Sequence, residues 1–189
     1  MNDIRTAHLS MTPTAVVRRS LAILAGAVLV ALSAQVAIPL PGNPVPITLQ
    51  VPAVLIVGGL LGPRLGAASM IVYLAFGAAG LPVFAPTGMP GVARLFGPTG
   101  GYLLAYPLAA ALVALIIGHG RSWLYLALGL VAGVAVIHVG GVAQLAILTG
   151  DVRTAVSLGS LPFLLLDVVK VLVAGLLIWR LRSKTRALL

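Results

Sequence analysis

Long stretches without any charged side chain are the feature that most restricts how this chain folds. No Asp, Glu, Lys or Arg occurs between Arg19 and Arg64, and the intervals from Arg64 to Arg94, from Arg94 to Arg121 and from Arg121 to Asp151 are equally free of charge. Apolar surface on this scale has to face lipid, because a water-soluble surface cannot be built from it.

The overall composition agrees with a membrane protein. Charged residues make up 8% of the chain and hydrophobic residues 60%, with a mean hydropathy of +1.16, whereas a soluble domain contains about 25% charged residues. These values exclude a soluble enzyme, a disordered chain and a coiled coil. The absence of cysteine also excludes disulfide frameworks and cysteine nucleophiles.

Six apolar segments fit membrane helices, which need about 20 residues to cross the hydrocarbon layer. They are residues 21–38, 49–61, 65–80, 101–117, 123–148 and 162–179. Arg18 and Arg19 precede the first segment as in a secretory signal, but no convincing cleavage site follows it, so we interpret it as a retained helix. We predict an all-α integral membrane protein with a cytoplasmic segment at 1–20, one six-helix domain at 21–180 and a basic cytoplasmic tail at 181–189.

The distribution of basic residues predicts the orientation of the chain. The net charge is +9, but the basic residues lie next to the apolar segments and form no stripe beside aromatic residues, so they do not indicate nucleic-acid binding. Cytoplasmic loops are rich in Lys and Arg. With both termini in the cytoplasm, only Arg94 and Arg153 lie outside. The inside then holds Arg5, Arg18, Arg19, Arg64, Arg121, Arg180, Arg182, Lys184 and Arg186.

Asp167 and Lys170 both lie within the last apolar segment. A charged group there costs at least about 2.5–3.5 kcal/mol, so a pair of them needs a reason. Their i, i+3 spacing puts them on one helix face, where they can satisfy each other. A structural ion pair is one interpretation. A ligand site about 8 to 12 Å below the outer helix end is the other.

Several further polar residues are candidates for the same site. Arg94, in a Gly- and Pro-rich outer connection, is either an interfacial anchor or a clamp for a carboxylate. Thr48 and Gln50 flank the outer end of the second apolar segment. Tyr73 lies within a segment and fits either a ligand wall or interhelical packing. His138 is interpreted as a hydrogen-bonded core residue, since no metal-binding constellation surrounds it.

The first apolar segment has small residues four apart, at Ala22 and Gly26 and at Ala27 and Ala31. Such pairs allow another helix to approach closely. Packing within the bundle and docking of a partner protein are both compatible with this pattern.

An ordered set of sequence landmarks resembles the BioY family, the biotin-specific substrate-binding (S) components of energy-coupling-factor (ECF) transporters. The resemblance covers about residues 21–179. The landmarks are Ile38–Gly42 with Pro44–Gln50, then Gly59–Gly66, Gly80–Phe84, Gly97–Leu103, and Pro162 and Phe163 with Asp167 and Lys170.

This resemblance implies a multi-pass protein of the cell's inner membrane that captures biotin from outside and uses no cofactor. It also implies a transmembrane coupling subunit, contacted through Ala27 and Ala31, and two ATP-binding cassette ATPases. The chain itself contains no nucleotide-binding or catalytic motif, so we expect a transport protein whose ATP hydrolysis occurs in its partners. Self-association is left open.

The residue types agree with biotin as the ligand. Asp167 can accept a hydrogen bond from a ureido N–H, and Lys170 can donate one to the ureido carbonyl. The apolar parts of biotin suit Tyr73, Phe84 and Tyr102, and its carboxylate suits Arg94, Thr48 and Gln50. The reverse pose, with the carboxylate on Lys170, is also compatible.

Three other functions are alternatives to biotin uptake. An S component for another vitamin would share the fold and differ in its pocket. An intramembrane enzyme would need a nucleophile with a base or paired carboxylates, but only one acidic residue lies in a predicted span. A channel would need polar pore-lining rings, which no span shows.

Overall fold

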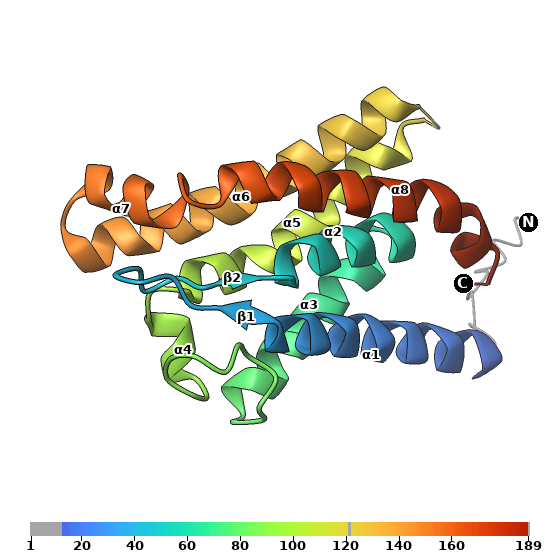
Figure 1. Cartoon of the computed structure of the whole chain (residues 1–189). Helices are drawn as coiled ribbons and strands as arrows, with labels where there is room; N and C mark the ends of the chain where they lie inside the picture. Colours follow the sequence, from blue (N-terminus) through green and yellow to red (C-terminus); the bar gives the residue numbers. More distant parts are fainter. Residues whose placement is uncertain (1–12, 121, 189) are drawn as a thin grey trace, which may run out of the picture.

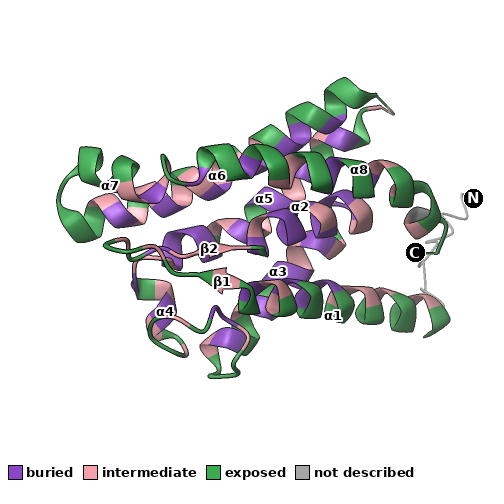
Figure 2. Ribbon diagram, in the orientation of Figure 1, coloured by how far each residue is buried: buried purple, intermediate pink, exposed green. Residues whose placement is uncertain are grey.

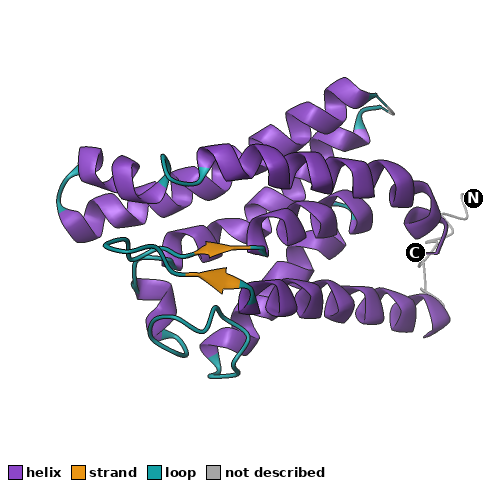
Figure 3. Ribbon diagram, in the orientation of Figure 1, coloured by secondary structure: helices purple, strands orange, loops and turns teal. Residues whose placement is uncertain are grey.

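The structure is a computed structural model that describes residues 13–120 and 122–188. Arg5 and Arg121, used above to predict the orientation, lie outside these ranges. The chain forms eight helices and two short strands in the described part (Figures 1 and 3). They are α1 (Pro13–Gln35), β1 (Ala37–Ile38), β2 (Ile47–Thr48), α2 (Gln50–Leu61), α3 (Pro63–Ala78), α4 (Ala93–Phe96), α5 (Gly100–Gly118), α6 (Trp123–Thr149), α7 (Val152–Gly159) and α8 (Leu164–Leu188).

Each of the six predicted segments corresponds to one helix, but the fold is not purely α-helical. The prolines after α1 leave the chain extended, and β1 pairs with β2 in antiparallel register, Ala37 opposite Thr48 and Ile38 opposite Ile47. The prediction also missed α4 and α7. Both are short helices inside the connections between predicted segments.

Length and apolar composition together decide which single helices could cross a membrane. α1, α5 and α6 are long and apolar enough, and α7 with α8 passes the same test as a broken span bent by 50°. α2 and α3 have 12 and 16 residues, which correspond to about 18 and 24 Å. The described part of the chain therefore contains three helices that are long and apolar enough to cross a membrane, or four if the bent pair is one span.

The core lies around α5, which packs against α2, α3 and α6, while α1 and α8 expose large apolar side chains on their outer faces (Figure 2). α5 and α6 approach closely at Gly101 and Gly140: a Cβ atom at Gly101 would lie 2.1 Å from the Gly140 carbonyl oxygen. The start of α1 and the end of α8 meet at one end of the bundle, where Arg18 Nη1 donates to the Leu188 carbonyl at 3.4 Å.

Candidate ligand-binding pocket

A pocket lies at the end of the bundle that carries β1, β2, α4 and α7, opposite the end where α1 begins and α8 stops (Figure 1). Its walls come from the β2–α2 segment, the chain around Phe84, α4, α5, α6 and the start of α8. It contains about 600 Å³ of space not filled by atoms, including the part that opens outward.

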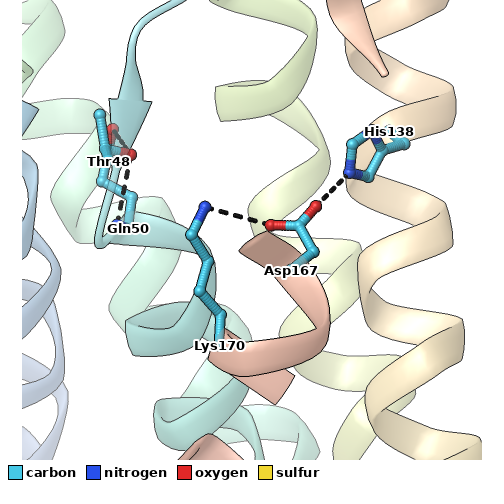
Figure 4. Close-up of polar contacts among 5 residues, drawn as sticks. All are labelled: Thr48, Gln50, His138, Asp167 and Lys170. Carbon is cyan, nitrogen blue, oxygen red and sulfur yellow. Dashed lines mark hydrogen bonds and ion pairs between the residues drawn. The ribbon is translucent and has the colours of Figure 1, made fainter. Parts of the chain in front are cut away.

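A buried carboxylate with two partners forms the polar centre of this pocket. Asp167 lies in the first turn of α8 and is 4% exposed. Its Oδ1 accepts a hydrogen bond from Lys170 Nζ at 3.1 Å, and its Oδ2 lies 2.7 Å from His138 Nε2 of α6 (Figure 4). The predicted pair of Asp167 and Lys170 is therefore in contact and lines the pocket, with a third residue that the sequence analysis did not place there.

Arg94 is buried in the pocket wall and is not an exposed interfacial anchor. It is 6% exposed, and its Nη2 donates to the Ala85 carbonyl at 2.6 Å. Burial lowers the pKa of its guanidinium, yet an arginine stays charged in proteins. Gln144 of α6 positions the segment by donating to the carbonyls of Leu95 at 3.0 Å and Gly97 at 2.6 Å.

Thr48, at the end of β2, and Gln50, at the start of α2, line the pocket, whereas Tyr73 does not. Thr48 Oγ1 donates to Gln50 Oε1 at 3.2 Å (Figure 4). Gln50 Nε2 donates to the Tyr73 hydroxyl at 2.7 Å. Tyr73 is fully buried behind the wall, edge-to-face with the lining residue Phe84. Tyr73 therefore does not form the ligand wall that was expected, because α3 lies behind the residues that line the cavity. It supports two of those residues, Gln50 and Phe84.

Aromatic rings form much of the apolar wall. Phe84 and Tyr102 line the pocket as expected, and Tyr106 and Phe163 join them. The Tyr102 hydroxyl donates to the Gly159 carbonyl, so this residue fixes the end of α7 and presents its ring to the cavity.

Three pocket residues carry buried polar atoms without a hydrogen-bond partner among the described residues. These atoms are Arg94 Nε, Thr99 Oγ1 and His138 Nδ1. A buried polar group left unpaired costs about 1–3 kcal/mol, so such groups need an explanation. Their concentration around one cavity is what a site for a polar ligand requires.

Sequence reasoning missed His138, Thr99, Tyr106 and Phe163 as pocket residues. His138 is hydrogen-bonded, as expected, but its partner is Asp167. The sequence does contain a signal for His138, because a polar side chain in the middle of an apolar segment needs a hydrogen-bond partner, as Asp167 does. Thr99, Tyr106 and Phe163 carried no comparable signal. Within residues 13–120 and 122–188, no group of three His, Cys, Asp or Glu side chains could hold a metal ion.

Ala27 and Ala31, the residues predicted to contact a coupling subunit, differ in their exposure. Ala27 is 1% exposed and belongs to the hydrophobic core, and Ala31 packs against the same cluster. Gly26 faces α3, where an added Cβ would lie 2.6 Å from Ser69 Oγ. Gly26 and Ala27 therefore serve packing within the bundle, whereas Ala31 is partly exposed and its contact with a coupling subunit stays a prediction.

Asp151 caps α7 at the pocket end of the molecule. Its carboxylate accepts hydrogen bonds from the Thr154 hydroxyl and from the backbone N–H groups of Thr154 at 2.8 Å and Arg153 at 3.3 Å. These bonds, the hydroxyl's first, hold the pKa of Asp151 below its ordinary value of 3.8. The cap's contribution is therefore fully present above that value and is lost as pH falls through the lower folded-state pKa.

We expect α7 to open more readily at acidic pH for this reason. The Thr154 amide should be protected from hydrogen exchange, corrected for intrinsic rates, at pH 7 and should lose this protection only at a pH below 3.8, as Asp151 becomes protonated. An Asp151→Ala variant should show low protection at both pH values. Equal protection of the wild-type amide across this range would contradict the capping role.

The apolar helices, together with a pocket that contains the Asp167–Lys170 pair, define a membrane-embedded small-molecule-binding protein. Comparison with known proteins narrows this class. The model of the BioY family matches residues 5–187, and the chain belongs to this family.

Named relatives and a solved structure agree with the family assignment. The biotin transporter BioY of Thermotoga maritima is 41% identical over 156 residues, which cover 82% of this chain and 90% of that protein. A probable biotin transporter BioY of Pyrococcus horikoshii is 40% identical over 157 residues, which cover 83% of this chain and 91% of that protein. The crystal structure of the S-component for biotin from an ECF-type ABC transporter matches with a TM-score of 0.82 at 27% identity, covering 92% of this chain and 95% of that one.

Proposed function

We propose that this chain is the S component of an ECF-type transporter, which captures biotin on the outer side of the membrane for uptake into the cell. The observation that carries this proposal is the buried Asp167–Lys170 pair inside the pocket of a BioY family member. The names of the relatives and of the matching structure support biotin as the ligand.

The pocket chemistry supports one pose of biotin. The ureido ring lies against Asp167 and Lys170, so that the carboxylate accepts from an N–H and the ammonium donates to the carbonyl. The biotin carboxylate lies near Arg94 and Thr99, whose Nε and Oγ1 lack partners in the described protein. Charge also balances: Asp167, Lys170 and Arg94 sum to +1, which a biotin carboxylate neutralises.

The orientation in this proposal puts the pocket outside and the ends of the chain inside. Arg94 and Arg153 lie at the pocket end, whereas Arg18 and the basic residues of late α8 lie at the other. The positive-inside rule therefore favours a pocket that opens away from the cytoplasm. In this arrangement α2 and α3 complete six crossings as short helices in the inner membrane. Partner ATPases and a coupling subunit, which docks elsewhere than on Ala27, supply the energy.

Direct binding tests this function. Protein freed of endogenous ligand and reconstituted in nanodiscs should bind one biotin per chain in titration calorimetry, and riboflavin or thiamine should not compete. Biotin methyl ester should bind at least about tenfold more weakly, because Arg94 loses its charged partner. Binding of another vitamin without binding of biotin would favour the alternative, an S component of different specificity.

The same titration distinguishes the two poses. With the carboxylate at Arg94, an Arg94→Gln variant should lose most of the preference for the acid over the ester. Loss of that preference in Lys170→Gln instead would indicate the reverse pose.

A further inference from the structure

We infer that His138 is a positioning residue for ligand recognition: it holds the Asp167 carboxylate in the orientation that reads the ligand's N–H groups. This inference rests on the proposed biotin function and adds a residue that the pair of Asp167 and Lys170 does not include. Its basis is the geometry of three side chains from two helices in the pocket wall (Figure 4).

The two oxygens of Asp167 have different partners. Oδ1 lies 3.1 Å from Lys170 Nζ, on the same helix, and Oδ2 lies 2.7 Å from His138 Nε2, on the facing helix α6. A carboxylate restrained at both oxygens cannot rotate about its last bond. It still has free lone pairs, since two oxygens offer about four acceptor positions. His138 and Lys170 thus leave Asp167 able to accept from a ligand in one defined orientation.

The environment of the imidazole indicates which nitrogen carries the proton. His138 Nε2 faces a carboxylate, so it donates, whereas Nδ1 is buried and has no partner among the described residues. A protonated Nδ1 would leave a buried N–H unpaired, which is costlier than an idle lone pair on a neutral ring. His138 therefore donates its Nε2–H to the Asp167 carboxylate.

Aromatic contacts hold the imidazole in place. Tyr102 lies at 6.4 Å between ring centroids with the planes at 76°, and Phe163 lies at 6.4 Å with the planes at 49°. Both rings line the same cavity. The histidine is thus packed by the pocket's own wall, which keeps its Nε2 directed at Asp167.

Two substitutions separate the donor role from simple packing. His138→Gln keeps an N–H donor near the position of Nε2, whereas His138→Leu fills similar space without one. We expect biotin affinity to fall about 10- to 100-fold in His138→Leu, as for loss of one charged hydrogen bond, and to stay within about threefold of wild type in His138→Gln. Titration calorimetry in nanodiscs measures both, and the thermal midpoint without biotin reports whether each variant folds.

A double-mutant cycle tests whether His138 acts through Asp167. In an Asp167→Asn background, His138→Leu should cost less than about a further threefold, because the carboxylate that it positions is gone. His119→Leu serves as the matched control: His119 is exposed at the far end of α5, bonded to the Leu115 carbonyl, and its loss should leave affinity unchanged.

The outcomes distinguish this inference from the proposed function. Wild-type protein that fails to bind biotin overturns the function itself. Wild-type protein that binds biotin, together with unchanged affinity in His138→Leu, equal losses in His138→Leu and His138→Gln, or losses that multiply with Asp167→Asn, overturns the positioning role alone.

Discussion

Replacing Asp167 with asparagine is expected to weaken biotin binding at least about tenfold. The amide keeps one acceptor oxygen, but its NH₂ group faces a donor, either Lys170 or His138, in place of an acceptor. The ligand then loses a charged hydrogen bond of about 1.5–3 kcal/mol, and tenfold in affinity corresponds to about 1.4 kcal/mol. The partly buried Lys170 also loses its counter-ion, which adds to the loss.

Titration of biotin into the reconstituted variant measures this effect. Asp151→Asn is the matched control, since it makes the same chemical change at an exposed helix cap where asparagine is also a good capping residue. Its affinity should equal that of wild type. Unchanged affinity in a folded Asp167→Asn protein would remove Asp167 from the binding site.

Replacing Gly101 with valine is expected to separate α5 from α6 and to destabilise the protein by about 3 kcal/mol. An added Cβ at this position would lie 2.1 Å from the Gly140 carbonyl oxygen and 2.8 Å from Gln144 Cβ. Backbone atoms cannot move aside as a flexible side chain can, so the helices must shift. Because Tyr102 follows Gly101 and Gln144 anchors the segment after Arg94, biotin binding should fall as well.

Thermal unfolding in detergent, with and without biotin, measures this change. Gly118→Ala provides a control on the same helix, because nothing lies within 4 Å of an added Cβ there. That variant should be as stable as wild type or slightly more so, since alanine favours helix over glycine by about 1 kcal/mol. Similar midpoints for the two variants would contradict the close-packing argument.

Local sequence information was sufficient for the membrane class, the six main helices and the acid–base pair. Charge-free apolar runs have one low-energy arrangement, a helix that satisfies its own backbone, and prolines and glycines mark where each helix ends. Asp167 and Lys170 could be paired in advance because their spacing on one helix determines their distance. The short helices α2 and α3 were visible as short apolar runs, but their position relative to a membrane depends on their neighbours.

The other contacts join residues that are far apart in the chain. His138 meets Asp167 across 29 positions, and Gln50 meets Tyr73 across 23. No periodicity predicts which faces of two helices come together, because that depends on how all the helices pack. The same limit applies at Ala27: a pair of small residues shows that something packs closely, but not whether the partner lies inside or outside the bundle.

The sequence alone thus determined the solvent in which this protein folds, its helices and its buried charge pair, because each follows from local composition and spacing. The tertiary structure decided that Arg94 turns inward, that Tyr73 stands behind the wall and that His138 completes the polar centre. Those choices depend on which helix faces meet, and only the packed bundle determines them.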